Sequence, residues 1–379
     1  MTSAEILMMI ILFVTAGTYT LLIMLFTAGW SKLKMNHRTE AAVTRMSVII
    51  PLRNESNNIR RLLEMLLSQN YPEDLYELIL VNDHSGDDTA EQLHKHPDSD
   101  KITFLELPDG SSGKKSALMF GIAHAKGKLI VTTDADCRAG DEWLKAIEAY
   151  YCMGNFRMIA GPVAIENPSG WLAKFQSLEF ISLQGSGAGA IGIGLPIMNN
   201  GANLAFEKYA FEEVKGYSGN EHIPGGDDIF LLEKFKKEYG PQSIGFVKNR
   251  TAIVYTDASK NLNSFLNQRF RWVAKSPAYR DPAIIFTAFI VFLLNLELLI
   301  CLFWAPLSYN IFIVAGAIFL FKCVSDLPLL WKATGFFRQR HLLRNYLPFQ
   351  LSYFSFIVIS VVLGNLFSYK WKERNSRIN

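Results

Sequence analysis

The chain has 379 residues, of which 50% are hydrophobic and only 19% are charged. Soluble domains usually carry about a quarter charged residues, so this composition predicts that part of the chain lies in lipid. The net charge of +3 is too small to indicate a nucleic acid as partner. The four cysteines show neither paired motifs nor metal-ligand spacing, which excludes a disulfide framework and a zinc module.

The first apolar segment runs from Ile6 to Trp30 without a charged side chain, and we delimit the predicted membrane anchor as residues 5–30. This is longer than the roughly 20 residues that cross the hydrocarbon core. A secretory signal peptide would have basic residues before a shorter apolar core, whereas here Lys32 and Lys34 follow the apolar segment. The positive-inside rule therefore predicts that the C-terminal side of the anchor is cytoplasmic.

Three further apolar segments follow near the C-terminus, at residues 283–304, 307–330 and 346–369. The first two are predicted to span the membrane, joined near Pro306. Lys322 and Asp326 lie four residues apart, where they could pair on one helix face. Basic residues flank the last segment on both sides, which would put both of its ends in the cytoplasm. That segment is therefore either a transmembrane helix whose tail departs from the rule, or a re-entrant or interfacial one.

Between these apolar segments, residues 46–275 alternate short apolar runs with helical apolar spacing. The predicted strands are residues 47–50, 78–81, 102–105 and 129–133, and the predicted helices are 57–69, 87–94 and 115–125. The pattern predicts a mostly parallel α/β sheet with helices on both faces. Ligands of such sheets bind beyond the carboxyl ends of the strands.

Acidic residues follow three of these predicted strands. Glu55 comes after the first strand, Asp83 after the second, and Asp134 and Asp136 after the fourth. Each residue alone could be part of a turn or a helix cap. Carboxylates gathered at one sheet edge repel each other unless a cation or donor groups hold them. A shared site therefore explains the three clusters better than three separate caps do.

The ordered motifs of this middle segment resemble those of the family 2 inverting glycosyltransferases. They are, in chain order, Val48–Pro51, Val81–Asp83, Gly113–Lys115, Asp134–Asp136, Asn200–Phe206, Gly226–Asp228 and Gln268–Trp272, the last with the pattern QxxRW. The resemblance covers about residues 46–275. The apolar segments and the positive-inside rule predict that this part of the chain is a cytoplasmic domain with transmembrane helices at both ends. The resemblance implies that the domain has a GT-A fold, which is Rossmann-like and mostly parallel. It also implies a nucleotide-sugar donor and a divalent cation, Mg²⁺ or Mn²⁺.

By this resemblance, the donor would be bound by Pro51, Glu55, Asp83, Lys114, Asp134, Gln268 and Arg271. Asp136 would hold the cation, and Asp134 would contribute to both the cation and the nucleotide. Asp83 would accept the N3–H of uracil, which indicates a UDP-sugar, although Asn82 stands where the family more usually has a second Asp. Lys114 would face the diphosphate, and a solvated loop lysine is the alternative.

An inverting transfer needs one carboxylate to take the proton of the acceptor hydroxyl while that oxygen attacks the anomeric carbon. The resemblance makes Asp228 this base, and Asp227 and Trp272 would contact the acceptor. The two acids precede a predicted helix, so they could instead stabilise its N-terminus. Gln268, Arg271 and Trp272 would share one helix face, where Arg271 can form two hydrogen bonds to phosphate. The same face could also lie at the membrane surface.

Residues 187–192 match the glycine spacing of a dinucleotide-binding loop. No predicted strand precedes them, so we reject that interpretation. We expect this run of small residues to form a flexible floor or lining beside the acceptor site.

Three functions are compatible with these features. The first is transfer of one sugar to a lipid hydroxyl in the membrane, as in the ceramide glucosyltransferases, which share the arrangement of apolar segments and a closing (Q/R)xxRW motif. The second is a processive polysaccharide synthase, for which the polar residues Glu297, Lys322 and Asp326 are few to line a channel, and this favours the lipid acceptor. The third is a non-catalytic membrane subunit with a relic nucleotide-sugar pocket. We expect a multi-pass protein of the cell membrane with a cytoplasmic catalytic domain.

Overall fold

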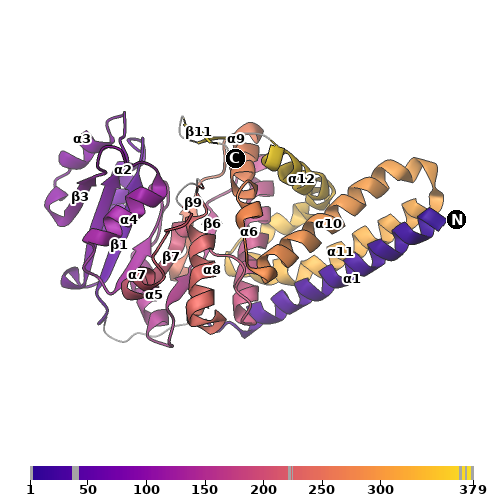
Figure 1. Cartoon of the computed structure of the whole chain (residues 1–379), viewed down its shortest axis with the longest axis horizontal. Helices are drawn as coiled ribbons and strands as arrows, with labels where there is room; N and C mark the ends of the chain where they lie inside the picture. The colour runs from indigo at the N-terminus through magenta and orange to yellow at the C-terminus, as the bar shows by residue number, and fades with distance from the viewer. Residues whose placement is uncertain are drawn as a thin grey trace.

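The computed structural model describes residues 3–35, 42–220, 223, 225–366, 369–371 and 374–376. The end of the last predicted membrane segment (residues 367–368) and part of the basic tail after it (residues 372–373) lie outside these ranges. An α/β domain occupies one end of the molecule and long helices occupy the other, with the N-terminus at the far tip of the helices (Figure 1).

Four helices in the described part of the chain are long and apolar enough to cross a membrane. They are α1 (Ser3–Lys32), α10 (Pro282–Trp304), α11 (Tyr309–Phe336) and α12 (Tyr346–Leu366), the last preceded by the 3-10 helix η8 (Arg340–Asn345). The 3-10 turn η7 (Ala305–Leu307) joins α10 to α11 at the predicted place. Exposed side chains such as Phe13, Phe289 and Phe312 give these helices an apolar surface suited to lipid.

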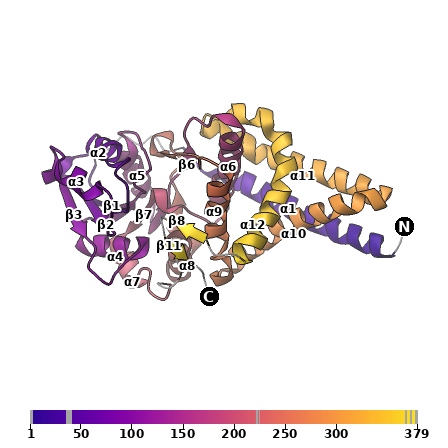
Figure 2. The same ribbon diagram turned by 90° about the horizontal axis from the view of Figure 1, so that it is seen from above.

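The last of these helices is oriented differently from the other three. α1, α10 and α11 lie side by side and extend away from the domain, whereas α12 runs across them beside α9 (Leu262–Val273), as the two views in Figures 1 and 2 show.

A seven-stranded sheet with the strand order β3-β2-β1-β4-β7-β5-β8 forms the centre of the domain. The parallel neighbours are β3 (Ile102–Glu106), β2 (Tyr76–Asn82), β1 (Met46–Leu52) and β4 (Leu129–Thr132). The antiparallel β7 (Leu204–Glu207) is followed by the parallel pair β5 (Met158–Ala160) and β8 (Ile244–Phe246). Two smaller sheets pair β6 (Val163–Ile165) with β9 (Val254–Thr256) and β10 (Tyr369–Trp371) with β11 (Arg374–Ser376). The four predicted strands are confirmed.

Helices pack on both faces of the large sheet, because successive side chains of a strand point to opposite faces. Ile50 packs with the buried face of α2 (Ile59–Leu67) and with α5 (Trp143–Tyr151), whereas Ile49 packs with α4 (Lys114–His124). The remaining helices of the domain are α3 (Thr89–His94), α7 (Lys208–Glu213) and α8 (Asp227–Tyr239). Its 3-10 turns are η1 (Glu73–Leu75), η2 (Ser99–Lys101), η3 (Gly201–Asn203), η4 (Pro241–Ser243), η5 (Arg250–Ala252) and η6 (Ser276–Ala278).

The helix α6 (Gly170–Gly192) packs against α1 and thereby joins the domain to the membrane helices. A β-carbon added to Gly189 would lie 2.2 Å from the carbonyl oxygen of Phe26, and one added to Gly29 would lie 1.9 Å from the carbonyl oxygen of Gly189. Only glycine permits two backbones to come this close. The small residues 187–192 therefore belong to a regular helix packed against another, and the expectation of a flexible floor or lining was wrong.

Polar side chains inside the helix bundle form one connected network. Lys322 Nζ donates to Asp326 Oδ2 and to Gln350 Oε1, both at 2.8 Å, and the Tyr19 hydroxyl donates to Asp326 Oδ1 at 2.7 Å. The predicted pairing of Lys322 with Asp326 is confirmed. The network ties α1, α11 and α12 together, and the two buried charges of Lys322 and Asp326 neutralise each other.

Candidate active site

One cavity of about 830 Å³ extends from the carboxyl edge of the large sheet into the helix bundle. Every site residue selected from the sequence lines it: Pro51, Glu55, Asp83, Lys114, Asp134, Asp136, Asp227, Asp228, Gln268, Arg271 and Trp272. The same cavity is lined by Tyr19 of α1, Val291 of α10, Leu330 of α11 and Tyr353 of α12. A charged sheet edge and an apolar membrane region therefore share one space.

Asp83 lies directly after β2 and is fixed in place by neighbouring backbone groups. Its N–H donates to the Leu52 carbonyl at 2.8 Å, and its carboxylate accepts the Gly113 N–H at 3.0 Å. Arg53 donates to the Asp83 carbonyl at 2.7 Å. These bonds connect the ends of β1 and β2 with the loop that precedes α4. The Asp83 carboxylate is thus held at the cavity wall with 2% of the residue exposed.

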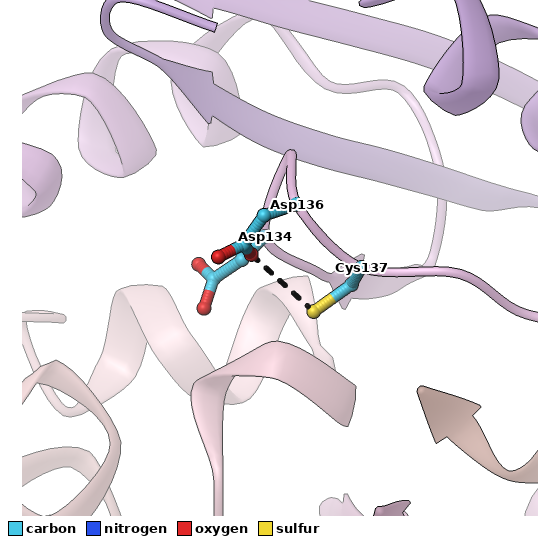
Figure 3. Close-up of side chains that lie close together, drawn as sticks. All are labelled: Asp134, Asp136 and Cys137. Atoms are coloured by element: carbon cyan, nitrogen blue, oxygen red, sulfur yellow. Dashed lines mark hydrogen bonds between the residues drawn. The ribbon is translucent and has the colours of Figure 1, made fainter. Parts of the chain in front are cut away.

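Asp134 and Asp136 follow β4 on either side of the buried Ala135. Figure 3 shows their carboxylates close together beside Cys137, whose Sγ lies 3.7 Å from Asp136 Oδ1. Lys114 Nζ donates to Asp134 Oδ1 at 2.6 Å, so this lysine is tied to the cluster and is not a solvated loop residue. Ligand atoms of Asp134, Asp136 and Cys137 all lie within 4.8 Å of one another.

The two carboxylates of this cluster suit a hard divalent cation, whereas the thiol does not. Burial, together with the charges of Asp136 and Asp134, raises the pKa of the Cys137 thiol well above its usual value. The thiol therefore stays protonated at neutral pH and is a poor metal ligand. Mg²⁺ and Mn²⁺ prefer oxygen ligands. The residues present thus fit such a cation bound by Asp136, which is exposed, and Asp134.

The helix α8 begins with the two remaining acids, directly after Gly225 and Gly226. Asp228 Oδ1 accepts the N–H of Ile229 at 2.8 Å, and its Oδ2 accepts the N–H of Gly201 at 3.3 Å. The Asn200–Phe206 motif is therefore in direct contact with this acid. Asp227 and Asp228 both stand at the helix N-terminus and both line the cavity, so the two interpretations of these residues are compatible.

The pKa values of these two neighbouring acids shift in opposite directions. Burial and the charge of Asp227 raise the pKa of Asp228. Burial alone would raise the pKa of Asp227, but Lys114 and Lys275 outweigh it and lower that pKa. Lys114 Nζ lies 3.7 Å from Asp227 Oδ2. Because a higher pKa means a stronger affinity for a proton, Asp228 is the better general base of the two.

The helix α9 brings the QxxRW sequence to the cavity. Sequence reasoning missed Arg269, whose Nε donates to Glu179 Oε1 of α6 at 3.1 Å. The Arg269 guanidinium also lies 4.1 Å from the centre of the Trp272 ring, and the Phe180 ring centre lies 6.1 Å from that of Trp272. These contacts fix the indole at the cavity wall. Glu179, an acid flanked by the apolar residues Leu178 and Phe180, was the signal that a buried cation should pair with it.

Lys275 is a second cavity residue that sequence reasoning missed. It lies two residues after the end of α9, lines the cavity and is 8% exposed. No motif marked it, because a lysine just beyond a helix end is usually a solvated residue.

Comparisons with known proteins agree with this geometry. Residues 47–214 match the model of a family described as Glycosyl transferase family 2. A poly-beta-1,6-N-acetyl-D-glucosamine synthase of Staphylococcus epidermidis is 28% identical over 247 residues, which cover 61% of this chain and 54% of the synthase. The probable glycosyltransferase YdaM of Bacillus subtilis is 26% identical over 310 residues, which cover 75% of this chain and 68% of that protein. The chain spans about half the length of the synthases it matches.

Among solved structures, the mannosyltransferase PcManGT from Pyrobaculum calidifontis in complex with GDP-Man and Mn²⁺ is similar to this chain. The TM-score is 0.62 at 18% identity, over 95% of this chain and 98% of that one. At this identity the similarity establishes the fold. The predicted GT-A domain with membrane helices at both ends is confirmed.

Proposed function

We propose that this chain is a family 2 glycosyltransferase that transfers a sugar from a nucleotide-sugar to a lipid acceptor in the membrane, with inversion at the anomeric carbon. The observation that carries this proposal is the cavity that joins the acids at the sheet edge to the membrane helices. A lipid hydroxyl can enter such a space from the bilayer side while the nucleotide occupies the sheet side.

The extent of the cavity favours a lipid over an extruded polymer. In α1, the residues that line the cavity start at Tyr19 and lie toward the C-terminal end of the helix. In α10 they extend from the N-terminal end only as far as Phe292, and in α11 they start at Asp326. In each of these three helices, the cavity therefore touches only the half that is nearer to the domain. A polymer needs a path across the whole membrane, whereas a lipid headgroup and the first part of its chains need only one half.

A processive synthase is the second candidate function, and one observation favours it: relatives of this chain are named poly-beta-1,6-N-acetyl-D-glucosamine synthases. The chain covers 54% of their length, so their activity as a whole does not transfer to it directly. The relic, non-catalytic alternative has less support, because the acids of the donor, cation and base positions all line one cavity.

In the proposed reaction, Asp228 takes the proton of the acceptor hydroxyl, which its raised pKa favours. Lys114 and Arg271 bind and orient the diphosphate. A divalent cation held by Asp134 and Asp136 would supply the positive charge that makes the diphosphate a better leaving group. Trp272, fixed by Arg269, presents its flat face to the acceptor.

The nucleotide base is proposed to be uracil, because the Asp83 carboxylate can accept its N3–H. The structurally similar mannosyltransferase was solved with GDP-Man, so guanine is the alternative base. Glu55, which is 6% exposed, is proposed to contact the ribose or the base from the neighbouring strand end.

For the topology, we propose that α1, α10 and α11 span the cell membrane and that α12 lies at its cytoplasmic surface. The arrangement in Figures 1 and 2 supports this, because α12 runs across the other three helices. Both basic flanks of α12, at Arg344 and Lys370, then stay on the cytoplasmic side together with the domain, as the positive-inside rule requires.

Product analysis tests the proposal. Membranes that contain the protein are incubated with Mn²⁺ and with labelled UDP-glucose, UDP-N-acetylglucosamine, UDP-galactose or GDP-mannose. We expect the label in an organic-soluble lipid, and no transfer after EDTA treatment until Mn²⁺ is restored. Label in a long insoluble polymer would instead establish the processive function. A purified protein that neither hydrolyses nor transfers from any of the four donors would favour the relic interpretation.

A further inference from the structure

Lys275 is a buried cation that the proposed mechanism does not use. The residue lines the cavity and is 8% exposed. Within the described part of the chain, its ammonium makes no hydrogen bond and no ion pair within 4.0 Å. The ammonium therefore faces the cavity from an enclosed position where water solvates it poorly, and such a position suits an anion.

Other buried lysines of the structure have partners, which makes Lys275 stand out. Lys115 Nζ donates to the carbonyls of Asn220 and Ile223 at 2.7 and 2.8 Å. Lys322 is paired with Asp326 in the helix bundle. The fold therefore gives these two lysines partners, and one of them, Lys115, lines the same cavity as Lys275. Among the described residues, the Lys275 ammonium has no hydrogen-bond or ion-pair partner.

The turn before α8 is shaped to admit the Lys275 side chain. Gly225 and Gly226 have φ angles of 75° and 71°, which favour glycine. A β-carbon at Gly226 would lie 2.9 Å from Lys275 Cδ, and one at Gly225 would lie 3.3 Å from Lys275 Nζ. The two glycines thus pack on the aliphatic stem and leave the ammonium beside the first turn of α8.

The surrounding charges leave room for an anionic ligand. Asp227 and Asp228 act on Lys275 by charge, but neither forms an ion pair with it within 4.0 Å. Arg271, four residues earlier in the chain, lines the same cavity. Two cations at one wall match an anion with several acceptor oxygens, and a phosphate group has this chemistry.

We propose that Lys275 binds a phosphate group where the sheet side of the cavity meets its membrane side. The inference rests on the proposed function, since both of its possible ligands are substrates there. The phosphate belongs either to the diphosphate of the donor or to a phospholipid acceptor whose hydroxyl reaches Asp228. Lys275 precedes α10, which begins at Pro282, by only a few residues, so lipid headgroups are within its reach.

Binding measurements on the full-length purified protein test this without turnover. Lys275→Met keeps the stem and removes the charge, and Lys275→Arg keeps the charge. Lys248→Met is the matched control, because Lys248 lies outside the cavity lining and donates to the carbonyls of Trp30 and Leu33 at the end of α1. The probes are UDP and GDP with Mn²⁺, and detergent micelles that contain either phosphatidylglycerol or diacylglycerol.

We expect Lys275→Met to weaken binding of one phosphate-bearing probe about tenfold or more, and Lys275→Arg and Lys248→Met to stay near the wild type. Weaker binding of UDP or GDP identifies the donor diphosphate as the ligand. Weaker binding of phosphatidylglycerol, with diacylglycerol unchanged, identifies an acceptor phosphate. Unchanged affinity for every probe would overturn the inference. A wild type that binds neither nucleotide would instead contradict the proposed function.

Chemical modification of Lys275 in the wild-type protein provides a second test, which does not require that a variant folds. The protein is briefly acetylated and the modification of Lys275 is quantified by mass spectrometry. We expect UDP with Mn²⁺, or phosphatidylglycerol, to protect Lys275, whereas uridine and diacylglycerol do not. Equal labelling in all four conditions would contradict a phosphate at this position.

Discussion

The two parts of the cavity hold their lining residues in different ways. On the sheet side, charged side chains are fixed by hydrogen bonds and ion pairs, as in the contact of Lys114 with Asp134. On the membrane side, the lining consists largely of apolar side chains on helices, such as Val291 and Leu330. The first part can therefore discriminate between single atoms of a ligand, whereas the second can select only by shape and apolar character.

The largest effect is expected on the sheet side. Replacing Asp228 with Asn removes the proposed base but keeps the size of the side chain. We expect kcat to fall by about 10²–10⁴-fold, the usual contribution of general base catalysis, with nucleotide affinity nearly unchanged. Asp74→Asn is the matched control, since Asp74 is exposed and outside the cavity. Full activity of the Asp228 variant would show that another group is the base.

A smaller effect is expected on the membrane side, and it should appear in the KM for the acceptor and not in kcat. Thr287→Trp fills part of the cavity beside α10, at an overpacking cost of about 1–3 kcal/mol. We expect the KM for the lipid acceptor to rise roughly tenfold while the affinity for nucleotide stays the same. Ile285→Trp, on the exposed face of the same helix, is the control. If Thr287→Trp weakens nucleotide binding instead, the two parts of the cavity are not separable.

The smallest effect concerns pH. Asp228 must be deprotonated to act as base, and its pKa is raised by burial and by Asp227. The activity should therefore fall as the pH drops through a value above the usual aspartate pKa of about 3.9. Lys275→Met removes a charge that lowers this pKa, so the acidic limb of the kcat profile should move to still higher pH. An acidic limb that moves to lower pH in this variant would contradict the assignment.

The sheet and its acidic edge could be predicted because both depend on local sequence. Apolar runs such as Val48–Ile50 indicate buried strands, and the acids directly after them must lie where parallel strands end. The membrane helices were predictable for the same reason, since length and apolar composition are local properties.

The remaining features depend on how distant segments approach each other. The pairing of Arg269 with Glu179 requires α9 to lie against α6, and the position of Lys275 requires the turn at Gly226 to pack on it. The glycines of α6 carry no sign in the sequence that α1 is their partner. The direction of α12 was also not predictable, because a helix that is apolar on all sides shows no preferred face.

The close contact between Gly29 and Gly189 sets the position of the candidate active site relative to α1. Two backbones in direct contact leave little room to slide past each other, so α1 and α6 pack in one register. With α1 spanning the membrane as proposed, the site would reach a lipid hydroxyl at only one level of the headgroup layer. Once a sugar has been added, the new terminal hydroxyls stand farther from the membrane than that level, and this distance would end the reaction after one addition.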